Sequence, residues 1–223
     1  MNRVYWPNFG LAIYNPALIQ VAFLQDQTQG SINSSVVLWD LLKRQEVWRI
    51  THPDAWRTSP AWSPDGSFLA VAGQPRQDET VLSGFHYEIF LVQPNGVAHQ
   101  ATDLEAHLGH ALIWGLEWSP DGRWIAFWLE DKLPQRLDDP PLGTNKHLAV
   151  LDTSAMITTD YCIPGTSDAN SPLIWSPTST QIAVSSASTP EENGRVVILD
   201  IIERAAFRLP EGVGQPVGWI NTR

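Results

Sequence analysis

The chain has 223 residues, of which 43% are hydrophobic and 17% charged, and its formal net charge at pH 7 is −10. This composition indicates a folded chain with a sizeable core, and an all-β fold of this length is commonly a single domain. The negative charge argues against nucleic acid as the main partner, because such affinity comes from Lys and Arg neutralising phosphates. We therefore expect a neutral or basic protein or peptide partner.

Cysteine usage and hydropathy bear on the compartment. The single cysteine, Cys162, precludes an internal disulfide. The sequence shows neither an apolar run typical of a signal peptide nor a stretch long enough to span a membrane. These features predict a cytoplasmic protein without a membrane span, and a periplasmic location stays open if the natural N-terminus lies further upstream.

Strand-like segments come in groups, and the first group covers residues 9–50, after a short strand predicted at residues 3–6. In this group Tyr14 is followed by Pro16, and an apolar run comes next at residues 21–23. Two more apolar runs follow, each after a polar connection. The group therefore predicts four successive strands.

The second group, residues 57–103, contains the motif Trp-Ser-Pro-Asp-Gly at residues 62–66, followed by apolar residues 69–71. Proline fixes φ, the aspartate side chain can bond its own backbone, and glycine accepts positive φ. The motif therefore predicts a hairpin that joins the first two strands. A second hairpin signal, Pro-Asn-Gly, occupies residues 94–96.

The third group, residues 110–162, repeats the motif from Trp118, and the fourth, residues 170–209, repeats its frame from Trp175. The third group is interrupted at residues 130–146 by a segment rich in proline and charge, which predicts a long loop. Each of these groups again contains four strand-like segments.

A fifth group begins at residues 215–220, where we expect a terminal strand. The aromatic residues that open the five groups lie 44 to 57 residues apart: Tyr14, Trp62, Trp118, Trp175 and Trp219. Serial four-stranded sheets with such a period are typical of a β-propeller. We therefore predict one all-β propeller domain over residues 1–223, with four recognisable blades and the start of a fifth, either a small ring or an incomplete one.

The motifs resemble those of two propeller families. Trp-Ser-Pro-Asp-Gly followed by an apolar-Ala-apolar triplet is similar to the signature of TolB-like propellers. Trp39-Asp40 and Gly109-His110 resemble the Trp-Asp and Gly-His dipeptides that are characteristic of WD repeats. The periods are longer than the usual WD repeat, and only one copy has Gly-His. The resemblance implies a propeller fold and leaves function open, because both families present many unrelated surfaces on one scaffold.

A small residue recurs at the centre of the second strand of each blade. These strands are apolar without alternation, so both of their faces must be covered. We expect the central alanine to let the anchor aromatic of the neighbouring blade pack closely. The four positions are Ala22, Ala70, Ala126 and Ala183.

Most acidic residues in the motifs have a structural explanation. Asp65 and Asp121 belong to hairpin turns, and Asp40, Asp152 and Asp200 end strands just before turns, where aspartate caps exposed backbone N–H groups. We predict structural roles for all five. No nucleophile elbow, zinc-protease motif or P-loop occurs, and we expect Cys162 to pack as a small hydrophobe in a strand.

The densest set of candidate metal ligands lies between the second and third groups, at Asp103, Glu105, His107 and His110. Carboxylates and imidazoles could hold a metal ion for hydrolysis. The simpler interpretation is an inter-blade loop in which His110 bonds to neighbouring backbone. We prefer that interpretation and predict no metal, no cofactor and no catalytic residue.

The partner surface is predicted from the meander. Successive turns of a four-stranded meander alternate between the two faces of the disc, so the long insertions and the inter-blade links share one face, which we call the long-loop face. Loops on a rigid scaffold often carry binding residues, and tryptophan is favoured in binding hot spots. The candidates there are Trp56, Asp103, Glu105, His107, Trp114, Asp138, Asp139, Glu191 and Glu192.

Two main functions remain open from the sequence. The first is a non-enzymatic scaffold that binds a protein or peptide through the long-loop face and the mouth of the channel. The second is the propeller portion of a hydrolase of the prolyl-oligopeptidase-like kind, without its catalytic domain. A weaker third reading has channel residues holding a metal for hydrolysis.

Overall fold

The computed structural model of the chain describes residues 12–26, 34–52, 58–73, 87–109, 111–131, 145–166, 171–187, 194–210 and 215–220. Within these residues the strands form four sheets, each a four-stranded antiparallel meander. The prediction of an all-β fold built of four-stranded blades is confirmed.

The strands follow the predicted groups. Blade 1 contains β1 (Ala12–Tyr14), β2 (Gln20–Asp26), β3 (Ser34–Asp40) and β4 (Gln45–His52). Blade 2 contains β5 (Ala61–Trp62), β6 (Leu69–Gly73), β7 (Glu88–Val92) and β8 (Ala98–Gln100). Blade 3 contains β9 (Leu112–Trp118), β10 (Trp124–Glu130), β11 (His147–Asp152) and β12 (Ile157–Pro164). Blade 4 contains β13 (Leu173–Trp175), β14 (Gln181–Ser186), β15 (Arg195–Asp200) and β16 (Ala205–Arg208).

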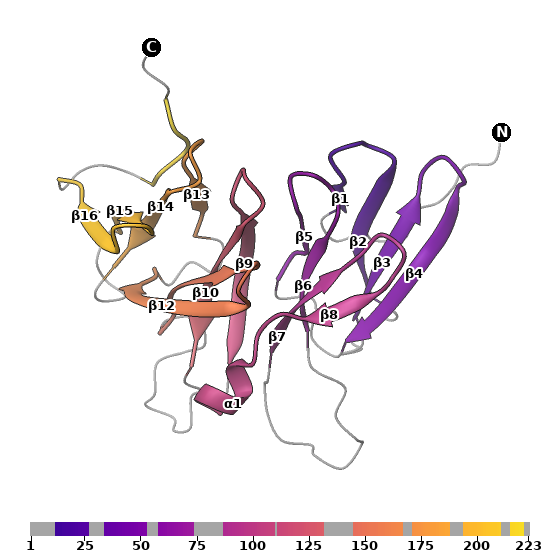
Figure 1. Cartoon of the computed structure of the whole chain (residues 1–223), viewed down its shortest axis with the longest axis horizontal. Coiled ribbons are helices and arrows are strands. Elements are labelled where there is room, and N and C mark those ends of the chain that lie inside the picture. Colours follow the sequence, from indigo (N-terminus) through magenta and orange to yellow (C-terminus); the bar gives the residue numbers. More distant parts are fainter. Residues whose placement is uncertain are drawn as a thin grey trace.

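The blades follow one another in an arc. The first strands are the inner ones, because β1 contacts β5, β5 contacts β9, and β9 contacts β13. Blades 1 and 4 lie on opposite sides of the view in Figure 1. The inner strands therefore form a continuous wall across the centre of the arc.

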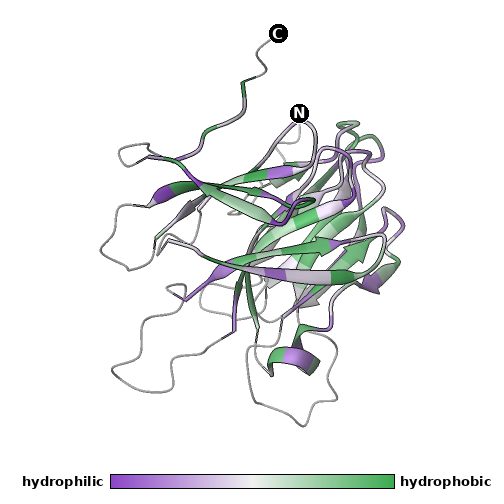
Figure 2. Ribbon diagram, turned by 60° about the vertical axis from the view of Figure 1, so that its left-hand side comes forward, coloured by the Kyte–Doolittle hydropathy of each residue, from purple (hydrophilic) through white to green (hydrophobic). Residues whose placement is uncertain are grey.

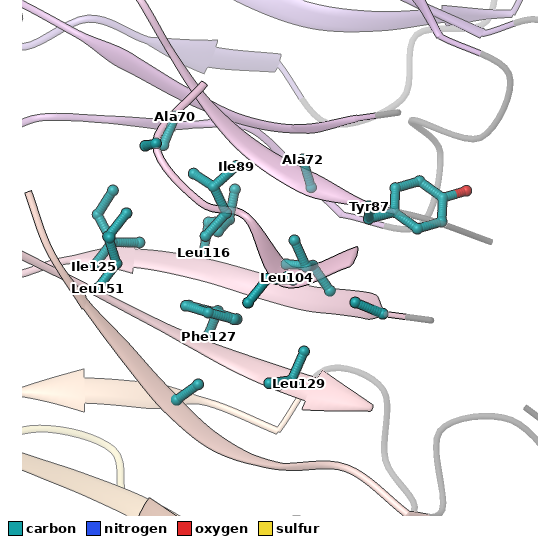
Figure 3. Close-up of a cluster of buried hydrophobic side chains, with 14 of the residues drawn as sticks. Ala70, Ala72, Tyr87, Ile89, Leu104, Leu116, Ile125, Phe127, Leu129 and Leu151 are labelled. Carbon is teal, nitrogen blue, oxygen red and sulfur yellow. The ribbon is translucent and has the colours of Figure 1, made fainter. Parts of the chain in front are cut away.

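The core lies between the blades. Its largest cluster joins blades 2 and 3: Ile89 of β7 faces Leu116 and Phe127 of blade 3, and Leu104 packs among them (Figure 3). A second cluster joins blade 3 to blade 4, and a third joins blade 1 to blade 2. Hydrophobic residues accordingly predominate in the strands where the sheets pack together (Figure 2).

The expectation for the central alanines is confirmed at three blade boundaries. Each of these alanines is fully buried and shares a cluster with the anchor tryptophan of the next blade. The pairs are Ala22 with Trp62, Ala70 with Trp118, and Ala126 with Trp175. A methyl group at the strand centre leaves the volume that the indole fills.

The hairpin motif is held by its own side chains. In blade 3 the hydroxyl of Ser119 accepts the Trp124 N–H at 2.9 Å and donates to Asp121 at 2.5 Å. Ser63 and Asp65 repeat this arrangement in blade 2. Both turn aspartates are thus structural, as predicted.

The strand-ending aspartates cap the next turn. One carboxylate oxygen of Asp40 accepts the N–H groups of Leu42 and Lys43, at 2.9 and 2.8 Å. Asp152 and Asp200 make the equivalent bonds in blades 3 and 4. These bonds lower the pKa of Asp40 and Asp200, in each case chiefly through a backbone N–H.

Three details differ from the sequence-based expectations. A short helix, α1 (Leu104–Leu108), replaces the expected loop between blades 2 and 3, because the buried Glu88 carboxylate accepts the N–H groups of Leu104 and Glu105. Cys162 is exposed, not packed, since the backbone there turns to φ +52°. Residues 215–220 do not form a strand, because no strand of the described chain pairs with them through backbone hydrogen bonds.

Candidate functional site

A ladder of indole hydrogen bonds holds the inner strands side by side. Each anchor tryptophan donates its indole N–H to a carbonyl of the preceding blade, at the residue just before that blade's own anchor aromatic. The bonds are Trp62 to Ile13 at 3.3 Å, Trp118 to Ala61 at 2.9 Å, Trp175 to Glu117 at 3.0 Å and Trp219 to Ile174 at 3.1 Å. Trp219 therefore extends the ladder beyond blade 4, although its segment has no strand partner in the described residues.

The inner strands enclose a cavity of about 660 Å³. All four blades line it. The lining consists of Ile13, Tyr14 and Pro16 from blade 1, residues 59–64 from blade 2, residues 115–118 from blade 3, and residues 171–173 leading into blade 4. This cavity occupies the position of the channel in a propeller, so it is our candidate functional site.

A β-bulge in β9 shapes one wall of the cavity. The pairing of β9 with β10 shifts register between Ala126 and Trp128, and Gly115 adopts φ +63° at this point. Only glycine takes this conformation without strain, and a bulge redirects the residues that follow it. The next two residues, Leu116 and Glu117, both line the cavity.

Glu117 is the only acidic or basic residue among the described residues that line this cavity. Glu117 is exposed to solvent at the opening of the cavity, beside the protein walls that line it. Burial raises the pKa of Glu117, because a carboxylate is less stable where water is displaced. No described residue donates a hydrogen bond to this carboxylate or pairs with it.

A second hollow, of about 510 Å³, lies between blades 2 and 3 beside the two hairpin turns. Asp65 and Asp121 line it together with His99 and Met156. The Ser63 hydroxyl, followed by the Ser67 N–H, lowers the pKa of Asp65. Because both aspartates are already engaged in their turns, this hollow offers fewer free polar groups than the central cavity.

The sequence-predicted site residues that the structure describes lie away from the central cavity. Asp103, Glu105 and His107 lie at helix α1, at the N-terminal end of β9. The Trp114 indole donates to Glu130 at 3.1 Å, and its ring packs against two core clusters. In the part of the chain that is described, no three His, Cys, Asp or Glu residues are arranged to hold a metal ion.

The other predicted site residues lie outside the described residues, so the proposed contact surface on the long-loop face stays a prediction. They are Trp56, Asp138, Asp139, Glu191 and Glu192. His110 and the terminal strand expected at residues 3–6 also lie outside this range.

Sequence reasoning missed Glu117, although the repeat contains a signal for it. Aligning the repeats on their anchor aromatics places Ile13, Ala61, Glu117 and Ile174 at the same position. Three of these residues are apolar, and one ionises. A charged residue at a position that is otherwise apolar in every repeat indicates a role outside the shared scaffold.

Comparison with known proteins agrees with this architecture. The family model of the WD domain, G-beta repeat, matches residues 99–126, from β8 into β10. The chain folds as a β-propeller, and one of its repeats is similar to this family. No curated protein matches its sequence.

Solved structures share the fold at low identity. A prolyl endopeptidase is 12% identical with a TM-score of 0.68, and the alignment covers 92% of this chain and 29% of that one. The β-propeller domain of the Trilobed protease from Pyrococcus furiosus is 14% identical with a TM-score of 0.55, over 93% of this chain and 57% of that one. TolB from Acinetobacter baumannii is 16% identical with a TM-score of 0.42, over 93% of this chain and 55% of that one.

The likenesses to the prolyl endopeptidase and to the β-propeller domain of the Trilobed protease confirm the predicted propeller fold. The chain spans about 29% of the length of the prolyl endopeptidase that it matches. None of the described helices is long and apolar enough to cross a membrane.

Proposed function

We propose that this propeller is a non-enzymatic scaffold that binds a protein or peptide segment at the mouth of its central cavity. The observation that carries the proposal is the cavity of about 660 Å³ framed by all four inner strands. Ligand pockets commonly enclose about 300–1,000 Å³ and are mostly apolar with a few polar groups. A cavity of this size can accept a few residues of a peptide, and the rigid sheets around it keep its shape.

The chemistry of the lining supports binding over catalysis. Its described polar side chains are serine hydroxyls, the Tyr14 phenol and the single carboxylate of Glu117. Activation of a serine requires an adjacent base, and the described lining contains no histidine or lysine. Its hydroxyl at Ser63 already donates to Asp65 and accepts the Phe68 N–H.

A second candidate function is the propeller portion of a peptidase of the prolyl-oligopeptidase-like kind. The structural likeness to a prolyl endopeptidase, with a TM-score of 0.68, favours it. In that case the cavity would admit peptides toward a catalytic domain outside this chain. A Gly-x-Ser-x-Gly hydrolase domain in the same reading frame, or as a chain that co-purifies in fixed ratio, would support this candidate over an independent scaffold.

The test of the first proposal is a peptide-array screen followed by titration of the best peptide. Ser59 lines the cavity and is half-buried, so Ser59→Phe places a ring across the opening. Val97→Phe is the matched control, because Val97 is exposed in a turn outside the cavity. We expect Ser59→Phe to weaken binding at least tenfold and Val97→Phe to leave it unchanged. Equal affinity of both variants, or an array without any binding peptide, would overturn the proposal.

A further inference from the structure

We propose that Glu117 makes the central cavity selective for one cationic side chain, a lysine or arginine that a bound peptide inserts beside the carboxylate. This inference rests on the proposed function, since it names the chemistry by which the same cavity recognises its peptide. It commits to a single contact at a single residue and does not depend on the overall charge of the chain.

Charge complementarity is the first argument. The carboxylate of Glu117 stands among apolar walls, prolines and serine hydroxyls, and the described lining contains no cation to neutralise it. Glu117 is exposed at the opening, and the neighbouring walls displace part of the water around its carboxylate. An inserted ammonium or guanidinium group would offset this loss of hydration by pairing with the carboxylate.

The cost of leaving Glu117 unpaired is the second argument. The surrounding protein raises the pKa of Glu117, and no described hydrogen bond offsets this effect. A structural carboxylate in this chain looks different: buried Glu88 accepts hydrogen bonds from Thr102, Leu104 and Glu105. The contrast indicates that the fold satisfies Glu88 internally and leaves Glu117 available to a ligand.

The position of Glu117 is the third argument. Its own backbone carbonyl accepts the Trp175 indole N–H at 3.0 Å, and Trp118 beside it donates to Ala61 at 2.9 Å. Two rungs of the indole ladder therefore fix the backbone on both sides of this residue. A binding carboxylate held on a strand is more precisely placed than one on a loop.

The apolar lining suits the stem of such a side chain. Ile13, Leu116 and Leu173 line the cavity, and Tyr14 adds an aromatic ring that is 54% exposed. Lysine and arginine pack their methylene groups along apolar surface while the charged end reaches a polar partner. An aromatic ring nearby also favours a cation.

The test uses two blocked pentapeptides, acetyl-Ala-Ala-Lys-Ala-Ala-amide and the same peptide with norleucine in place of lysine. The norleucine side chain keeps the apolar stem and removes the charge. Trp62 and Trp118 line the cavity, so intrinsic tryptophan fluorescence reports binding. We expect the lysine peptide to bind the wild-type chain at least tenfold more tightly, and Glu117→Gln to remove this difference.

Glu203→Gln is the matched control, because Glu203 lies exposed in the turn after β15 and its loss changes the net charge equally. It should leave the preference for lysine intact. If both peptides bind the wild-type chain equally, the cavity binds peptides without selecting a cation, so this inference fails and the proposed function stands. If Glu203→Gln removes the preference, the overall charge explains it and the inference fails. If neither these pentapeptides nor any array peptide binds, the proposed function fails as well.

Discussion

Blades 1 and 3 carry the same repeat in a worn and an intact form. In blade 3 the anchor Trp118 is 6% exposed and packs into the cluster that joins it to blade 2. In blade 1 the equivalent Tyr14 is 54% exposed, and no described blade lies on that side of it. The difference shows that contact with a neighbouring blade, and not the geometry of the hairpin, determines whether the anchor side chain is buried.

The hairpin itself survives in both blades through different chemistry. In blade 3 the Ser119 hydroxyl holds the turn by donating to Asp121 and accepting the Trp124 N–H. In blade 1 the side-chain Oδ1 of Asn15 instead accepts the N–H groups of Ile19 and Gln20, at 3.0 and 3.1 Å. A repeat can therefore lack the anchor tryptophan and the Asp-Gly pair and still fold as a hairpin.

The largest expected effect is at the anchors. Trp118→Ala removes a buried indole and its hydrogen bond to Ala61 at the interface between blades 2 and 3. Loss of a buried aromatic side chain costs about 3–5 kcal/mol. Tyr14→Ala should change the free energy of unfolding by less than about 0.5 kcal/mol, because the ring is largely exposed. Urea unfolding followed by circular dichroism measures both changes.

A conservative variant separates packing from hydrogen bonding at this anchor. Trp118→Phe keeps most of the buried ring but leaves the Ala61 carbonyl without its indole partner, so we expect a loss between those of the two alanine variants. If Trp118→Ala and Tyr14→Ala lowered the free energy of unfolding equally, contacts between blades would not determine how much an anchor side chain stabilises the fold.

The next effect concerns the hairpins, where the two blades should behave alike. Ser119→Ala leaves the Trp124 N–H without its acceptor, and Asn15→Ala leaves the N–H groups of Ile19 and Gln20 without theirs. These bonds are part-buried, so the loss should lie toward the lower end of the about 1–3 kcal/mol that a fully buried donor without a partner costs. We expect both variants to lose stability within this range, as measured by urea unfolding. A neutral Asn15→Ala would show that blade 1 holds its turn by other means.

The sequence predicted the scaffold better than the site. Trp-Ser-Pro-Asp-Gly predicts a hairpin from local turn chemistry alone, and the recurrence of Trp62, Trp118 and Trp175 predicts the blades, because both signals repeat. Cavities arise from segments far apart in the chain, such as those around Ser59, Glu117 and Ser171. A bulge that redirects Glu117 leaves only one glycine, Gly115, as its trace in the sequence.

Local interactions also explain the smaller errors. The α1 segment became a helix because Glu88, fourteen residues before Thr102, supplies acceptors for its first N–H groups. Cys162 became exposed because Asp160 accepts its N–H at 2.7 Å in a locally irregular part of the β11–β12 pair. Neither contact follows from periodicity, since the first joins residues sixteen positions apart and the second depends on a local irregularity within one strand.

A smaller effect distinguishes blade 3 from blade 1 at the cavity. The raised pKa of Glu117 means that the folded state binds its proton more tightly than the unfolded state does. The folded state therefore loses stability as pH rises above the ordinary glutamate range toward the raised value. Glu117→Gln should raise Tm at pH 7 by a small amount and have less effect near pH 4. The equivalent Ile13 does not ionise, so Ile13→Val should give the same shift at both pH values in thermal scans.

The smallest expected effect lies at the exposed strand ends. The Arg123 guanidinium contacts Asp152 at 2.9 Å and, with the Ser154 hydroxyl and nearby backbone N–H groups, lowers the pKa of Asp152 to about 2. A lowered carboxylate pKa contributes stability above the unfolded value of about 4, and this contribution is lost as pH falls from about 4 toward 2.

In blade 1 a backbone N–H from Lys43 is the main cause of the lowered pKa of Asp40. Arg123→Gln should therefore raise the pKa of Asp152 and leave that of Asp40 unchanged, in a carboxyl NMR titration. The change in stability should be slight at pH 7 because water and salt screen this pair. An unchanged Asp152 pKa would show that Ser154 and the backbone N–H groups of the turn set it without Arg123.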